Sequence, residues 1–81
     1  MNDFYKLPAE FQAMLENSPT WLTRKALAAL SSGTLSPRTL SNLDASNRGP
    51  AVRRKMRKYV VYPKREGIFW LWGYLTEFNK E

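Results

Sequence analysis

The sequence of 81 residues contains no cysteine and no histidine. Without cysteine a disulfide framework is excluded, and without either residue type a zinc or haem site is not expected. The lack of disulfides fits a reducing compartment, which predicts a cytoplasmic protein. No apolar stretch approaches the roughly 20 residues needed to cross a bilayer, and the first residues lack the basic cluster of a signal peptide. We therefore expect no metal, no cofactor and no membrane-spanning segment.

Acidic residues are also scarce, with seven against thirteen Lys and Arg, and they are unevenly placed. Asp44 is the only acidic residue between Asn17 and Arg65, and the others lie nearer the two ends of the chain. The stretch from Arg48 to Arg65 instead carries eight basic residues and no acidic one. Such a one-sided cationic field suits a polyanion, nucleic acid before an anionic membrane, although basic residues also serve solubility alone. Solubility does not require segregated charges, so nucleic acid is the favoured partner.

The residue types of a catalytic site are equally scarce. The carboxylates are scattered, and the sequence shows neither a general acid–base pair nor a glycine-rich phosphate loop. We therefore expect a binding protein and not an enzyme, with no small-molecule substrate.

Two short helices are predicted in the middle of the chain. Thr23 is an N-cap candidate for a helix over about 24–31, and a turn containing Gly33 follows it. Ser36 is the N-cap candidate for a second helix, which begins at Pro37 because proline suits the first helical position and extends to about Leu43. Two helices joined by a glycine-containing turn form a helix-turn-helix.

The second of these helices carries a polar face with the chemistry of DNA recognition, although an ordinary surface helix is the alternative. Leu40 and Leu43 share one face, and the opposite face holds one cation with small polar side chains. The residues expected to contact bases or phosphates are Ser36, Arg38, Thr39, Ser41 and Asn42, of which Arg38 suits guanine and Asn42 suits adenine. Plain solvent exposure is the alternative for each, and packing is a further one for Thr39. Arg24 and Lys25, on the first turn of the preceding helix, are placed for phosphates.

A basic β-hairpin is predicted after the second helix. Its strands are expected at Ala51–Arg54 and Lys58–Tyr62, with a link at Lys55–Arg57. A basic hairpin that follows a helix-turn-helix is a wing, which lies along the sugar-phosphate backbone or enters the minor groove. The cations assigned to the backbone are Arg48, Arg53, Arg54, Lys55, Arg57 and Lys58, with Arg54, Lys55 and Arg57 expected at the tip. The aromatic residues Tyr59 and Tyr62, like Val61 and the tryptophans, are expected in the core instead of stacking on bases.

The two ends of the chain are predicted to be helical. Residues 1–20 form an extension with a short amphipathic helix that Pro8 begins, and residues 21–81 form the DNA-binding domain. A last helix over about 64–78 has an inward stripe of Ile68, Leu71, Trp72, Leu75 and Phe78, and further aromatics lie off that stripe. Something must cover this surface, either the N-terminal helix or a second copy of the protein.

Several segments occur together in a characteristic order: Trp21–Lys25, Leu35–Leu40, Arg48–Pro50, and Val60–Pro63 with Trp70–Leu71. In this order they resemble the MerR-like winged helix-turn-helix family of small phage and mobile-element proteins, over about residues 21–72. The family includes excisionases, also called recombination directionality factors, and AlpA-type prophage regulators. The resemblance implies an α+β winged helix-turn-helix with a two-stranded hairpin and sequence-specific binding of double-stranded DNA.

An excisionase of this family binds attachment-site DNA as several adjacent copies, bends it, and directs an integrase toward excision. The resemblance thus implies self-association on DNA, an integrase partner, and a place on the bacterial nucleoid. A prophage transcriptional regulator would use the same surfaces. An RNA-binding module is a rival, but its strands should carry aromatics where these carry arginines. A protein-interaction adaptor working through the aromatic last helix is another.

Overall fold

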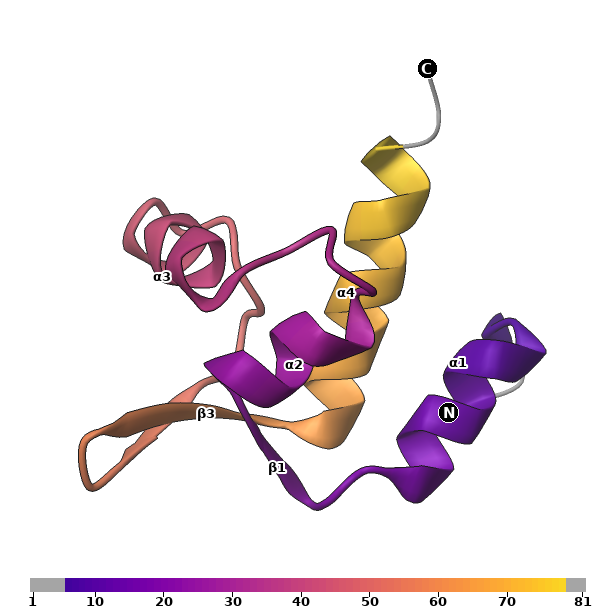
Figure 1. Cartoon of the computed structure of the whole chain (residues 1–81), viewed down its shortest axis with the longest axis horizontal. Coiled ribbons are helices and arrows are strands. Elements are labelled where there is room, and N and C mark those ends of the chain that lie inside the picture. The colour runs from indigo at the N-terminus through magenta and orange to yellow at the C-terminus, as the bar shows by residue number, and fades with distance from the viewer. Residues whose placement is uncertain (1–5, 79–81) are drawn as a thin grey trace.

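The structure is a computed structural model that describes residues 6–78, with side chains as far as Thr76. Within this range it has four helices and a three-stranded antiparallel sheet of order β1-β3-β2 (Figure 1). The elements are α1 (Ala9–Asn17), β1 (Trp21–Thr23), α2 (Arg24–Leu30), α3 (Pro37–Ala45), β2 (Arg54–Met56), β3 (Tyr59–Pro63) and α4 (Lys64–Phe78). The α+β class predicted from the sequence is confirmed.

The starts of the two central helices are those that the sequence predicts. The Thr23 hydroxyl accepts a hydrogen bond from the Ala26 amide at 3.0 Å, which caps α2. The Ser36 hydroxyl accepts one from the Thr39 amide at 3.1 Å, and Pro37 occupies the first turn of α3. Each cap satisfies a backbone donor that the helix leaves unpaired, so both helix starts are fixed locally.

The sheet has one strand more than the two predicted. Residues 21–23 form β1, which pairs with β3 in the register Leu22 with Tyr62 and Thr23 with Val61. A strand of three residues is too short to show the apolar and polar alternation by which strands are recognised in a sequence. The predicted two-stranded hairpin is present as β2 and β3, and β1, which was not predicted, adds a third strand that anchors the hairpin to the body of the protein.

The hairpin also lies further along the chain than predicted. Strand β2 begins at Arg54 and not at Ala51, and Met56 lies opposite Tyr59. The turn is therefore made by Arg57 and Lys58 alone, and Arg57 adopts a positive φ of 56°. Two-residue hairpin turns need positive φ because their twist must match that of the strands. The sequence offers no glycine or asparagine at this turn, which is why the position was misjudged.

The core joins all the helices to one face of the sheet. Leu22, Leu27, Leu40, Tyr62, Ile68 and Leu71 are essentially inaccessible to solvent. Helix α1 packs against α4 and adds Leu7, Phe11 and Leu15 to the same buried cluster (Figure 1). The surface of α4 that needed a cover is thus partly covered by α1 of the same chain, with Trp72 and Leu75 left half-buried. The predicted inward position of Phe78 lies outside the described side chains.

None of the helices in the described residues combines the length and the hydrophobicity that crossing a bilayer demands.

Candidate nucleic-acid interface

A groove lies between the hairpin turn and the N-terminal ends of α2 and α3. Its volume is about 380 Å³. The residues that line it are Thr23, Arg24 and Lys25 from one wall, Pro37 from α3, and Lys58, Tyr59 and Val60 from the hairpin. Lys25 and Lys58 are exposed and come from segments more than thirty residues apart in the chain. The fold thus brings the start of α3 and the cationic turn to one concave surface.

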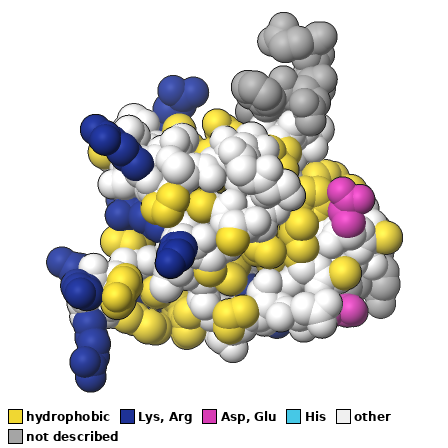
Figure 2. Space-filling view, in the orientation of Figure 1, with side chains coloured by type: hydrophobic (Ala, Val, Ile, Leu, Met, Phe, Trp, Pro, Cys, Tyr) yellow, Lys and Arg dark blue, Asp and Glu magenta, His cyan; other side chains and the backbone are white. Residues whose placement is uncertain are grey.

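Positive charge is concentrated on the same side of the molecule. Figure 2 shows Lys and Arg side chains over the region of α3 and the hairpin, whereas the acidic side chains visible on this face lie at the opposite end, near α1. The segregation that the sequence shows along the chain is therefore preserved in space. A surface with this distribution attracts a polyanion to one side only.

Of the five predicted contact residues at the start of α3 and along it, three are exposed, namely Ser36, Arg38 and Asn42. Arg38 and Asn42 are exposed and lie four residues apart, which places them on one helical face. Thr39 and Ser41 are half-buried. The Ser36 hydroxyl, besides capping α3, lies 2.9 Å from the Thr39 hydroxyl. Arg38 and Asn42 are consequently the side chains of α3 with the freedom to reach a base edge.

A buried carboxylate fixes the relative position of α2, α3 and β3. Asp44, at the end of α3, accepts hydrogen bonds at Oδ2 from Arg24 Nη2 at 2.8 Å and from the Tyr62 hydroxyl at 2.6 Å. Arg24 Nε also donates to the Tyr62 hydroxyl at 3.2 Å. The Asp44 side chain is only 4% exposed, so these contacts are shielded from water. Arg24, which the sequence assigns to phosphate, is thus engaged within the protein and holds the helix pair together.

These contacts change the acid–base properties of the partners. Burial, followed by the hydrogen bond to Asp44, raises the pKa of Tyr62 to about 12. Desolvation by burial lowers the pKa of Arg24, but its hydrogen bonds to Asp44 and Tyr62 outweigh this, so the pKa of Arg24 is raised. Both groups keep their protons at neutral pH, so Tyr62 is a neutral hydrogen-bond donor and Arg24 is a cation.

The loop after α3 closes over the same carboxylate. The second oxygen of Asp44, Oδ1, has no hydrogen-bond partner among the described residues and lies 3.8 Å from Arg53 Nη1. Gly49 packs so close to Oδ1 that a side chain on this residue would overlap it. Gly49 is therefore required by space. Arg53 is shared between this carboxylate and solvent, which sets it apart from the freely exposed cations of the hairpin.

The hairpin presents its remaining cations to solvent in two groups. Arg57 and Lys58 form the turn and are exposed, and Lys55 is exposed on β2. Arg54 lies at the other end of β2, with its guanidinium 5.7 Å from the centre of the Trp21 ring. Arg57 is at the tip as predicted. The prediction that Arg54 also lies at the tip was wrong, because β2 begins at Arg54 and the turn follows three residues later. Lys58 Nζ lies 5.6 Å from the centre of the Tyr59 ring.

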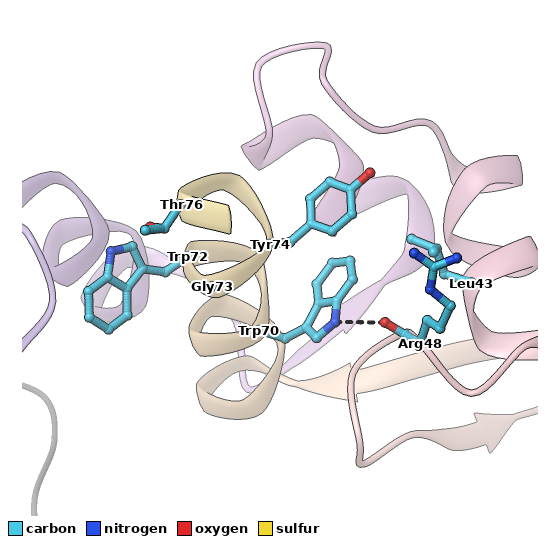
Figure 3. A pocket seen from close by; sticks show the side chains of 7 residues that line it. All are labelled: Leu43, Arg48, Trp70, Trp72, Gly73, Tyr74 and Thr76. Atoms are coloured by element: carbon cyan, nitrogen blue, oxygen red, sulfur yellow. Dashed lines mark hydrogen bonds between the residues drawn. The ribbon is translucent and has the colours of Figure 1, made fainter. Parts of the chain in front are cut away.

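Arg48 lies on a different surface, a hollow of about 730 Å³ beside α4. Figure 3 shows its side chain beside Leu43, with Trp70 and Tyr74 on the side of α4 that faces this loop and Trp72 on the other side. The Trp70 Nε1 donates to the Arg48 carbonyl oxygen at 3.1 Å, which ties the loop after α3 to α4. Arg48 thus lines a hollow separate from the groove that Lys25 and Lys58 line.

Two side chains of the hairpin were missed by the sequence analysis. Tyr59 is 54% exposed and Met56 is 42% exposed, so the prediction that Tyr59 lies in the core was wrong. Val61 and Tyr62 are buried as predicted. Strand β1 covers β3 only from Val61 to Pro63 and leaves Tyr59 without a neighbour on that side. The extent of β1, which the sequence does not reveal, decides this difference.

Comparison of the chain with protein-family models, with curated proteins and with solved structures finds no match.

Proposed function

We propose that this protein is a sequence-specific double-stranded DNA-binding protein of the winged helix-turn-helix type. The observation that carries the proposal is the groove with the start of α3 on one wall and the cationic hairpin turn on another. A duplex that places its major groove against α3 would run its sugar-phosphate backbone past this concave surface. Helix α3 is then the recognition helix and the hairpin is the wing.

The recognition helix supplies two side chains of the types that distinguish base pairs. Arg38 presents a guanidinium fork that matches the two major-groove acceptors of guanine, and Asn42 presents an amide that matches adenine. Both side chains are exposed, and among the described residues neither is hydrogen-bonded to another side chain. The buried contact of Asp44 with Arg24 and Tyr62 ties this helix to α2 and β3, which positions the two side chains relative to the groove.

The wing and the start of α2 supply the contacts with phosphates. Lys25 and Lys58 both line the groove, and Lys55 and Arg57 are exposed on the same hairpin as Lys58. Contacts with phosphates fix the position of a protein on the duplex but carry no sequence information. These four residues therefore contribute to the affinity for any duplex, whereas Arg38 and Asn42 contribute to the preference for a particular base sequence.

Within this function the role we propose is that of an excisionase, which the resemblance of residues 21–72 favours. Such a protein acts on the bacterial nucleoid, self-associates on attachment-site DNA and cooperates with an integrase. The bend in the DNA costs free energy that additional wing and phosphate contacts offset. A prophage transcriptional regulator is the alternative, and the position of the gene beside an integrase gene would favour the excisionase.

The test is a gel-shift titration on genomic fragments at moderate salt, followed by footprinting of the retained fragment. We expect saturable binding to a small set of fragments and protection of one face of the duplex. Lys25→Glu, in the groove, should weaken binding much more than Arg65→Glu on α4, which changes the net charge equally. A purified protein that retains no duplex at low ionic strength would overturn the proposal.

A further inference from the structure

The large hydrophobic side chains that are exposed in the described part of the chain all lie in or beside the hairpin. They are Val52 at 40%, Met56 at 42% and Tyr59 at 54% exposure. Figure 2 shows hydrophobic surface next to Lys and Arg side chains at this end of the molecule. A hairpin that touched only phosphates would have no use for apolar side chains beside its tip, because their exposure brings no favourable contact with an anion.

Met56 and Tyr59 form a pair at the base of the turn. They lie directly opposite each other in the register of β2 and β3, so their side chains project from the same face of the hairpin. The two residues between them, Arg57 and Lys58, form the cationic turn. The tip therefore carries two cations at its outermost point and an apolar pair immediately behind them.

We propose that the Met56 and Tyr59 side chains pack against the deoxyribose rings of the bound DNA while the turn cations neutralise the adjacent phosphates. This inference rests on the proposed DNA-binding function and adds a second recognised group, the sugar. The backbone of a duplex alternates anionic phosphates with largely apolar sugar edges over a few ångströms. The order of cations and apolar side chains along the hairpin tip is complementary to that alternation.

The order of polarity also argues against a membrane. A hairpin that enters a bilayer would carry its apolar side chains outermost, with cations behind them at the headgroups. Here Arg57 and Lys58 occupy the outermost position. A stable protein partner is disfavoured by size, because two side chains supply far less than the roughly 800 Å² per partner of a typical interface.

The two kinds of contact respond differently to salt, which gives the experiment. Phosphate contacts release counterions, so each one adds about 0.9 to the slope of log K against log salt, whereas apolar contacts do not. The double variant Met56→Ala with Tyr59→Ala should bind a DNA duplex about tenfold more weakly at every salt concentration, with the slope unchanged. Arg57→Ala should instead make the slope shallower by about 0.9.

Val52→Ala is the matched control, because it also removes an exposed hydrophobic side chain but lies four residues before Met56 and away from the turn. It should leave both affinity and slope unchanged. Met56→Gln with Tyr59→Gln keeps the side chains long while removing their hydrophobicity and should reproduce the tenfold loss. Urea unfolding of all variants shows whether the fold is retained.

A second measurement uses a double-stranded RNA of the same sequence. The 2′-hydroxyl groups make its shallow groove polar, so the apolar pair gains nothing there. The double alanine variant should lose DNA affinity and leave RNA affinity unchanged, which lowers the preference for DNA about tenfold.

The outcomes separate the inference from the function on which it rests. If the wild-type protein binds no duplex, the proposed function fails. If the wild-type protein binds but the double alanine variant binds DNA equally well, or loses affinity only through a changed slope, the sugar contact is refuted. It is also refuted if the variants keep DNA affinity and lose binding to phosphatidylserine vesicles.

Discussion

The Arg24 guanidinium and the Asp44 carboxylate lie 2.8 Å apart and join the first turn of α2 to the last turn of α3. The contact spans twenty residues of sequence and is completed by the Tyr62 hydroxyl from β3. Three elements that flank or support the groove therefore meet at one carboxylate. This contact therefore ties α3 to α2 and to β3.

Replacing Arg24 should lower the free energy of unfolding, because the buried Asp44 carboxylate loses its ion-pair partner. Arg24→Ala removes the cation paired with the Asp44 carboxylate, which is only 4% exposed in the native protein, so we expect the free energy of unfolding to fall by about 3 kcal/mol. Asp44→Asn added to Arg24→Ala removes the uncompensated charge and should recover part of the loss. Urea unfolding monitored by circular dichroism measures both. A double variant no more stable than Arg24→Ala alone would contradict this account.

Glycine is required at one position by space and tolerated at another. Gly49→Ala places a methyl group into Asp44 and should lower the free energy of unfolding by about 2 kcal/mol or more. Gly73→Ala is the matched control, because a methyl group there meets no atom within 4 Å and α4 gains helix propensity. We expect Gly73→Ala to raise the midpoint of thermal unfolding slightly. Equal effects of the two substitutions would refute the close approach of Gly49 to Asp44.

The raised pKa of Tyr62 predicts that the protein loses stability at high pH. Its pKa is raised to about 12 in the folded protein, compared with about 10 for an unfolded tyrosine. The folded state therefore favours the protonated hydroxyl, and this contribution is complete below pH 10 and is lost as the pH rises toward 12. Its upper limit is about 2.7 kcal/mol. Urea unfolding between pH 9 and 12 should show a smaller decline for Tyr62→Phe than for the wild type, and parallel curves would contradict the prediction.

The preference for a base sequence and the overall affinity for DNA should depend on different residues. Arg38→Ala should relax the discrimination between the footprinted site and a scrambled duplex, because a bidentate contact with guanine is worth about 1–3 kcal/mol. Arg57→Ala should weaken both duplexes alike, because its partner is a phosphate. Arg57→Gly is a useful companion, since glycine relieves the positive φ of 56° and excludes unfolding as the cause. Identical behaviour of the Arg38 and Arg57 variants in parallel titrations would refute this division.

The affinity for DNA should depend steeply on salt. If the four cations assigned to the backbone, Lys25, Lys55, Arg57 and Lys58, each neutralise one phosphate, log K falls against log salt with a slope of about −3.6. Fluorescence anisotropy with a labelled duplex over a range of potassium chloride concentrations gives the slope. A flat dependence would contradict the assignment of the hairpin and Lys25 to the phosphates.

The sequence by itself determined the features that depend on neighbouring residues. Thr23, Ser36 and Pro37 specify where α2 and α3 begin, because a cap and a helical first position are local interactions. The stretch of Val60, Val61 and Tyr62 specifies a strand, and the charge of the hairpin can be counted directly. The long apolar helix at the end of the chain was equally evident from its periodicity.

Only the tertiary structure decided the features that depend on distant partners. Strand β1 forms because residues 21–23 pair with β3, with Leu22 opposite Tyr62. Because β1 is short, Tyr59 remains exposed beside the turn. Asp44, which along the sequence is an isolated acid, becomes the meeting point of Arg24 and Tyr62. Pairing and burial of this kind arise between residues many positions apart, so no local pattern encodes them.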